Sequence, residues 1–184
     1  DLAFLQHMIA TLNVRGKMGI VMPHGVLFRG GAEGKIRRGL VEEDLIETIV
    51  GLPVNLFYGT GIPAAILILN RDKPKVRRTN VQFIEASRDF GEGTNQNALR
   101  PEDIRRIVAT AAAFEDVERY ARVVHADEIE RNDFNLNIGR YVDTAEEEES
   151  VDLTTAISRL QDAEIARDQA KAEMDSFLRE IGYE

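Results

Sequence analysis

A chain of 184 residues with 43% hydrophobic side chains is long enough for one domain with an appended segment. No run approaches the ~20 apolar residues that span a bilayer, which excludes a transmembrane protein, and the lack of cysteine excludes disulfides and thiolate metal sites. A cysteine-free chain suits the cytosol, and the net charge of −9 argues against an autonomous nucleic-acid binder.

Charge is unevenly distributed along the chain. Residues 1–143 carry 20 acidic and 19 basic side chains, whereas residues 144–184 carry 12 acidic and 4 basic ones. The last segment is therefore a different kind of structure from the rest. The chain begins at Asp1 without a methionine and enters a helix-like pattern at once, so we expect it to be the cut end of a longer protein.

The pattern begins with a helix and a strand. Asp1 is suited to cap a helix in which Leu2 and Leu5 share one apolar face. The apolar run Met18–Met22 then predicts a buried strand. Pairing should stop at Pro23, because proline cannot donate a hydrogen bond to a β-ladder.

The stretch GGAEGK suggests a phosphate-binding loop but fails on spacing. Gly30 to Gly34 is one residue short, and Ile36 stands where Ser or Thr would bind magnesium. We expect a helix that runs to about Glu43 and that opens with three cations, Lys35, Arg37 and Arg38. These cations either form a solvated helix face or contact a backbone phosphate.

Two further apolar runs, Leu45–Val50 and Ala64–Leu69, predict two more buried strands. The stretch between them, GLPVNLFYGTGIPA, is rich in glycine and proline and predicts a loop. It contains Phe57 and Tyr58, and aromatic residues in such a loop either fill the core or stack on a ligand. A flipped nucleic-acid base is one ligand that needs an aromatic face.

From Arg71 onward, loops alternate with predicted strands and helices. RDKPKVRR predicts an exposed hairpin or linker that is either solvated or in contact with DNA, and VQFIEAS predicts another strand of the sheet. Residues 88–98 predict a polar loop, and Pro101 begins a helix whose apolar face contains Ile104, Ile107, Val108 and Ala111. Tyr120–Val124 predicts a short strand, and NDFNLNIGRY is expected to close a small lobe.

The acidic tail divides into a linker and a helix. Thr144–Ser150 contains four consecutive glutamates and predicts a linker. A helix of about thirty residues follows from Val151, with a heptad pattern that includes three alanines. This helix either folds back on its own domain or docks on a partner helix, which the alanines would let approach closely.

Three stretches of the sequence resemble one protein family. They are DLAFLQHMIATL, GIVMPHGVLFRGGAEGKIRRGLVEEDLIETIVGLPVNLFYGTGIPAAILILN and NLNIGRYV. All three are similar to the modification subunit of type I restriction–modification systems, an adenine-N6 DNA methyltransferase. The resemblance covers at least Asp1 to Val142, and its long uninterrupted stretch makes it far more specific than a short motif.

The resemblance implies an α/β fold: the C-terminal part of a Rossmann-like methyltransferase sheet, a small α+β lobe and a C-terminal coiled-coil helix. The three apolar runs would be its fifth, sixth and seventh strands, the last antiparallel, with Met18–Met22 at an exposed edge. The family's glycine loop for S-adenosylmethionine and its Asn-Pro-Pro-aromatic motif are absent from this sequence. We expect three parts: residues 1–87 of the methyltransferase domain, a mostly helical lobe over 88–143, and the linker and helix over 144–184.

The same resemblance implies three sets of functional residues. The pocket for a flipped adenine would contain Pro23, His24, Gly25, Phe57, Thr60, Gly61, Ile62 and Pro63. The DNA backbone would be contacted by Lys35, Arg37, Arg38, Lys73, Lys75, Arg77 and Arg78. A partner helix would pack on Ala156, Leu160, Ala163, Ala170, Met174 and Phe177. No metal site is expected.

The function that follows from the resemblance is methylation of adenine N6 in duplex DNA by the intact cytoplasmic subunit, with S-adenosylmethionine as donor. Its expected partners are a DNA-specificity subunit and a restriction subunit. The chain alone is expected to bind no cofactor and to be inactive. It is also expected to self-associate through its exposed strand edge, through the alanine-lined helix, or through both. The alternative is a non-catalytic assembly module that docks a specificity subunit.

Overall fold

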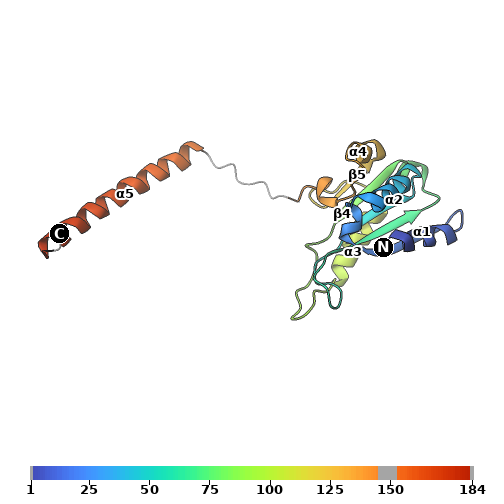
Figure 1. Ribbon diagram of the computed structural model, residues 1–184, viewed down its shortest axis with the longest axis horizontal. Helices are drawn as coiled ribbons and strands as arrows, with labels where there is room; N and C mark the ends of the chain where they lie inside the picture. The colour runs from blue at the N-terminus through green and yellow to red at the C-terminus, as the bar shows by residue number, and fades with distance from the viewer. Residues whose placement is uncertain (1, 145–152, 183–184) are drawn as a thin grey trace. The chain divides into compact units, whose positions relative to one another are not determined.

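The computed structural model describes residues 2–144 and 153–182. Two units follow each other along the chain, Asp1–Thr144 and Ala145–Glu184. The first holds a sheet with its helices, and the second holds one described helix, α5 (Leu153–Glu180) (Figure 1). Almost all of the expected linker Thr144–Ser150 lies outside the described residues. None of the described helices is long and apolar enough to cross a membrane.

The first unit is built on a five-stranded mixed sheet with the strand order β1-β3-β2-β4-β5. The strands are β1 (Lys17–Pro23), β2 (Ile46–Gly51), β3 (Ala64–Asn70), β4 (Asn80–Glu85) and β5 (Ala121–His125). β2 is parallel to β4, whereas β3 is antiparallel to its neighbours β1 and β2. The predicted strands are therefore confirmed, including the antiparallel third run, and β1 lies at one edge of the sheet.

Helices cover both faces of this sheet (Figure 1). They are α1 (Leu2–Thr11), α2 (Gly31–Glu42), α3 (Pro101–Ala113) and α4 (Ala126–Arg131), with short 3₁₀ turns η1 (His24–Leu27), η2 (Lys75–Arg77) and η3 (Ile138–Arg140). Apolar residues of α1, α2 and α4 share one core, and those of α3 share another. The helix expected over Lys35 to Glu43 begins earlier than predicted, at Gly31.

The two cores follow the alternation of side chains along each strand. In β4, Phe83 belongs to the core beneath α1, α2 and α4, and the next residue, Ile84, belongs to the core beneath α3. Tyr141 stacks on Phe83 with ring centroids 4.3 Å apart. The segment after α4 thereby closes the larger core.

No boundary separates residues 1–87 from residues 88–143. β5 pairs with β4 in the common sheet, and Leu136 and Ile138 are buried in the same core as Ile49. The main-chain nitrogen of Leu136 also donates to the carbonyl of Leu27 at 2.8 Å. The expected separate lobe over 88–143 is therefore wrong, because its strand and its apolar residues complete the first sheet and core.

Helix α3 buries a different face from the one predicted. Ile107 and Ala111 pack on the sheet as expected, but Ile104 and Val108 are exposed. The remaining buried positions are polar: Asp103 accepts hydrogen bonds from Arg100, and the carbonyl of Thr110 accepts one from the Gln82 side chain. Polar residues with internal partners thus replace half of the predicted apolar stripe.

Candidate functional site

The carboxyl ends of three strands meet at one edge of the sheet. β1, β2 and β4 all run in the same direction, because β3 is antiparallel to β1 and β2 while β4 is parallel to β2. They end at Pro23, Gly51 and Glu85, and the loops that follow lie at this carboxyl edge. Ligands of α/β proteins bind in crevices outside the carboxyl ends of strands.

An apolar cleft of about 220 Å³ lies at this edge. Its lining comes from the end of β1, the glycine- and proline-rich loop, and the start of β3: Val21, Met22, Pro23, Phe57, Thr60, Ile62, Pro63 and Ala64. The pairing of Pro23 with Ala64 brings the two strand ends together. Thr60 is the single polar side chain in this set, so the cleft suits a flat apolar group rather than a charged one.

The stretch from Leu52 to Pro63, which we call the base loop, has the irregular backbone that its composition predicts. Gly59 and Asn55 both adopt positive φ, which glycine and asparagine tolerate best. Phe57 keeps 41% of its surface exposed and Tyr58 keeps 94%, so neither ring fills the core. Of the two interpretations of these rings, the burial favours a surface that is free to meet a ligand.

The structure brings together five of the eight residues expected around a flipped base: Pro23, Phe57, Thr60, Ile62 and Pro63. Gly61 lines a neighbouring polar hollow that shares Phe57 and Thr60 with the cleft. His24 and Gly25 lie outside the lining of both hollows, in η1.

His24 supports the cleft through its backbone. Its main-chain nitrogen donates to the carbonyl of Pro63 at 3.1 Å, and its ring meets Phe28 edge-on at 6.0 Å. Burial lowers the pKa of His24, and the negative charge of Glu85 only partly opposes this, which favours a neutral imidazole. His24 therefore joins β1 to the base loop without adding a charge.

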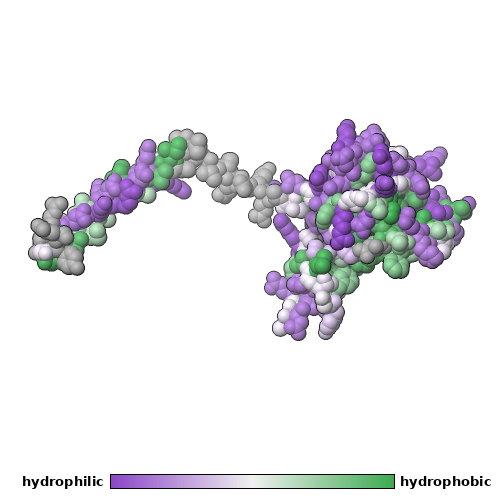
Figure 2. Space-filling view, viewed as in Figure 1, coloured by the Kyte–Doolittle hydropathy of each residue, from purple (hydrophilic) through white to green (hydrophobic). Residues whose placement is uncertain are grey.

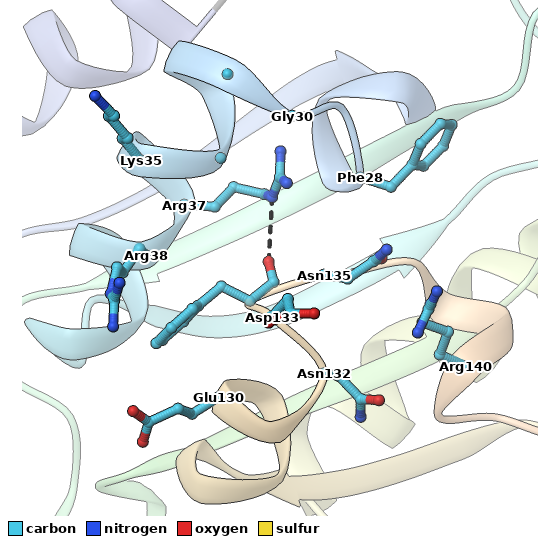
Figure 3. Close-up of a pocket in the computed structure, with 13 residues that line it drawn as sticks. Phe28, Gly30, Lys35, Arg37, Arg38, Glu130, Asn132, Asp133, Asn135 and Arg140 are labelled. Carbon is cyan, nitrogen blue, oxygen red and sulfur yellow. Dashed lines mark hydrogen bonds between the residues drawn. The ribbon is translucent and has the colours of Figure 1, made fainter.

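A larger cleft of about 620 Å³ lies between the first turns of α2 and the segment that follows α4 (Figure 3). Arg37 lies at its centre but is only 4% exposed. Its guanidinium donates from Nε to the carbonyl of Phe134 at 3.2 Å and from Nη1 to the carbonyls of Val26 and Arg29 at 2.9 and 2.6 Å. Burial lowers the pKa of Arg37, with Glu33 opposing the shift.

The expected solvent-facing role of Arg37 is therefore wrong, because its donors are used inside the protein. Arg37 lies three and four residues before Leu40 and Val41, which are buried on the same face of α2. This spacing predicts a buried side chain at position 37, whereas the positive charge of arginine predicts an exposed one. Lys35 and Arg38 remain at the surface; Arg38 pairs with Glu42 at 2.8 Å.

The basic segment that follows β3 lies at the opposite, amino edge of the sheet, since β3 ends beside the start of β1. Lys73 is buried, and its Nζ contacts Asp44 at 2.5 Å. Arg77 pairs with Glu47 at 2.9 Å. Arg78 donates to the carbonyl of Lys73 at 3.4 Å. Lys73 and Arg77 are thus structural ion-pair partners rather than free cations. Of the four residues expected to contact DNA from this segment, Lys75 and Arg78 are exposed.

The expected partner-helix residues all fall in α5. Leu160, Met174 and Phe177 are exposed, as are Ala163 and Ala170, while the side chain of Ala156 lies outside the described set. Hydrophobic side chains are visible along this helix among hydrophilic ones (Figure 2). Neighbouring residues in the described part of α5 do not bury these apolar side chains.

Comparison with known proteins gives a consistent assignment. Residues 1–150 match the model of the N-6 DNA methylase family. The chain is 41% identical over its whole length to the type I restriction enzyme MjaVII methylase subunit of Methanocaldococcus jannaschii, and it spans 31% of that protein. It is also 45% identical to the crystal structure of a type I restriction–modification methyltransferase subunit from Streptococcus thermophilus, with a TM-score of 0.74 over 78% of this chain and 30% of that one.

A more distant likeness concerns the fold alone. A chain from a structure described as the basis of complex assembly and conformational transition of the type I R-M system is 20% identical, with a TM-score of 0.62 over 97% of this chain and 39% of that one. The chain thus spans about a third of the length of the relatives that it matches. On the family match and on these identities, the chain belongs to the N-6 DNA methylase family and has methylase subunits of type I restriction enzymes as its relatives.

Proposed function

We propose that this chain forms the target-base side of a type I modification subunit that methylates adenine N6 in duplex DNA. The observation that carries the proposal is the apolar cleft at the carboxyl edge, where Phe57, Pro23 and Ile62 meet. An enzyme that modifies a base must take it out of the stack and hold it between apolar or aromatic surfaces. Phe57 is the one aromatic ring in the cleft lining, so it is the stacking surface.

The residues of the cleft bind and orient rather than transfer protons. Thr60 is its only polar side chain, and its hydroxyl already accepts a hydrogen bond from the main-chain nitrogen of Ile62 at 3.1 Å. Pro23 and Pro63 add apolar surface to the lining, which would help to exclude water from the base. The groups that act on the adenine amino group therefore belong to the part of the intact subunit that this chain does not include.

S-Adenosylmethionine is the methyl donor implied by the family for the intact subunit. The residues of this chain do not fit it: the sequence has no Asn-Pro pair, and its Gly30-Gly31 pair opens α2 beside the buried Arg37. We expect the chain alone to bind no S-adenosylmethionine and to transfer no methyl group.

Contact with the DNA backbone is best assigned to Lys35 and Arg38 on α2. The first turn of this helix follows η1 at the carboxyl edge, and both side chains line the larger cleft. Cations in such a place fix the register of a duplex through its phosphates. Lys75 and Arg78 lie at the opposite edge of the sheet and are the weaker candidates.

A second role, assembly, is favoured by the uncovered apolar side chains of α5. We assign this helix to packing against helices of a DNA-specificity subunit, with Ala163 and Ala170 at the closest approach. A restriction subunit would join the same complex. If α5 were the only functional part of the chain, the protein would be a non-catalytic assembly module.

The product of the reaction tests the proposed function. The intact subunit that carries this chain is assembled with its specificity subunit and incubated with plasmid DNA and S-adenosylmethionine. Nuclease digestion and mass spectrometry of the nucleosides should then detect N6-methyl-2′-deoxyadenosine. A different methylated base, or no modified base, would contradict the proposal.

A further inference from the structure

A hairpin that lies far along the chain contacts the base loop. The segment 88–98 was predicted only as a polar loop, but Gly91 and Ala98 exchange two main-chain hydrogen bonds, with N–O distances of 2.8 and 3.0 Å. We call residues 91–98 the clamp hairpin. It lies between β4 and α3 in the sequence, and it contacts the base loop through Gln96 and Asn97.

Two residues of the clamp hairpin that directly precede Ala98 donate to three consecutive carbonyls of the base loop. Asn97 donates from its main-chain nitrogen to the carbonyl of Asn55 and from Nδ2 to the carbonyl of Val54, both at 2.9 Å. Gln96 donates from Nε2 to the carbonyl of Leu56 at 2.6 Å. These three acceptors directly precede Phe57, so the clamp holds the backbone from which the stacking ring projects.

Asp89, two residues before the clamp hairpin, is attached to regular structure. The main-chain nitrogen of Asp89 donates to the carbonyl of Ala86, just beyond β4, at 3.1 Å. The carboxylate of Asp89 pairs with Arg106 of α3 at 3.0 Å. The clamp hairpin therefore connects the base loop to β4 and α3.

The base loop has little internal support of its own. Ile62 donates from its main-chain nitrogen to the Thr60 hydroxyl at 3.1 Å, and Thr60 donates from its main-chain nitrogen to the carbonyl of Phe57 at 3.5 Å, which is long for a hydrogen bond. Neither bond involves Val54–Leu56, and Gly59 has a positive φ. A glycine-containing loop of this kind has many conformations open to it. Catalysis tolerates little of this freedom, since a misplacement of ~1 Å costs up to about 100-fold in rate.

We propose that Gln96 and Asn97 are positioning residues for methyl transfer, whose side-chain amides hold Val54–Leu56 so that Phe57 meets the flipped base. The inference rests on the proposed function and deepens it. Gln96 and Asn97 act through the base loop, without touching the adenine. Asn95 lines the same polar hollow as Gln96 but makes no hydrogen bond from its side chain within the described residues, so it serves as a matched control.

The first test is kinetic and uses the intact subunit assembled with its specificity subunit. The double variant Gln96→Ala/Asn97→Ala should lose up to about 100-fold in kcat, with the KM for DNA unchanged. The isosteric pair Gln96→Glu/Asn97→Asp, which keeps the shape but removes the donors, should lose kcat as well. Asn95→Ala should keep the wild-type kcat. A rise in the KM for DNA shared by Asn95→Ala would overturn the proposal, because the hairpin would then contact DNA directly.

The second test is hydrogen exchange of the same proteins without DNA, which does not depend on methylation. Both double variants should show faster exchange at the amides of Asn97 and Thr60, which donate to the carbonyls of Asn55 and Phe57, than the wild type and Asn95→Ala. Unchanged protection, or lost protection with a normal kcat, would overturn the proposal. If the wild type failed to methylate adenine while the variants still lost protection, the proposed function would fail and the clamp itself would stand.

Discussion

Arg37 donates a hydrogen bond from Nε to the carbonyl oxygen of Phe134 at 3.2 Å, across 97 residues of sequence. The same guanidinium reaches the carbonyls of Val26 and Arg29. One buried cation therefore joins η1, the helix start and the segment after α4. The larger cleft is shaped around this connection, which makes Arg37 a structural residue in a place where its charge suggests DNA contact.

Replacement of Arg37 with methionine should destabilise the first unit. Each buried carbonyl that is left without a donor costs about 1–3 kcal/mol, and Val26 and Phe134 would both be affected, so the expected loss is about 2–6 kcal/mol. Arg38→Met is the matched control; its pair with Glu42 is exposed and screened by solvent, so the free energy of unfolding should stay close to that of the wild type. Denaturant unfolding of the 184-residue chain measures both values, and equal losses would contradict the structural role of Arg37.

Glu47 should make the stability of the fold depend on pH. Its buried carboxylate contacts Lys17 at 2.6 Å and Arg77 at 2.9 Å. Burial alone would raise the pKa of Glu47, but the hydrogen bonds from Lys17 and Arg77 outweigh it and hold the pKa below its ordinary value. A carboxyl whose pKa is lower when folded stabilises the fold above its unfolded pKa of about 4.3, and the contribution is lost as pH falls through the folded pKa.

The variant Glu47→Gln tests this dependence. It should lose about 1–3 kcal/mol of unfolding free energy at neutral pH, because a charged acceptor is removed from a buried site. Its free energy of unfolding should also fall less steeply than that of the wild type below pH ~4.3. Glu42→Gln, at an exposed pair, is the control and should change neither quantity appreciably. Parallel acid profiles for Glu47→Gln and the wild type would contradict the assignment.

The docking role of α5 can be tested with charge at its alanine seam. Ala163→Glu/Ala170→Glu should abolish assembly with the specificity subunit, since a carboxylate buried without a partner costs several kcal/mol. Gln161→Glu/Gln169→Glu adds the same charge at exposed positions outside the predicted seam and should assemble normally. Co-purification of the intact subunits measures the effect. Retained assembly of the alanine double variant would show that the seam is elsewhere.

The edge position of β1 predicts self-association of the isolated chain. In the described sheet β1 pairs with β3 alone, and Val21 of β1 is exposed. An uncovered strand edge with apolar side chains pairs readily with another chain. Analytical ultracentrifugation over a range of concentrations should show species larger than the monomer. A single monomeric species whose Met18–Met22 amides are all protected from exchange would count against this prediction.

Much of the fold could be predicted from local pattern. Runs of Ile, Val and Leu between glycine- and proline-rich stretches located β1, β2 and β3, because short buried strands have little other composition. The base loop was recognisable because aromatic residues rarely sit among so many glycines and prolines. These features depend on residues close together in the sequence.

What the sequence did not predict depends on contacts between distant residues. The charges of Arg37 and Lys73 predict solvent-facing side chains, and only the fold supplies the carbonyls and the Asp44 carboxylate that bind them. The separate lobe was predicted wrongly because nothing local shows that β5 pairs with β4. The clamp hairpin was missed for the same reason, since the acceptors of Gln96 and Asn97 lie some forty residues earlier.

The central claim, that Phe57 is the stacking surface for the target adenine, is tested most directly by Phe57→Ala in the intact subunit. Stacking of a base on an aromatic ring is worth ~1–3 kcal/mol, so methylation should fall roughly 5- to 150-fold while the melting temperature changes little. Phe4→Ala removes another exposed ring, on α1 and outside the linings of both clefts, and this control should retain its activity. A large fall in melting temperature with near-normal specific activity for Phe57→Ala would show instead that the ring fills the core.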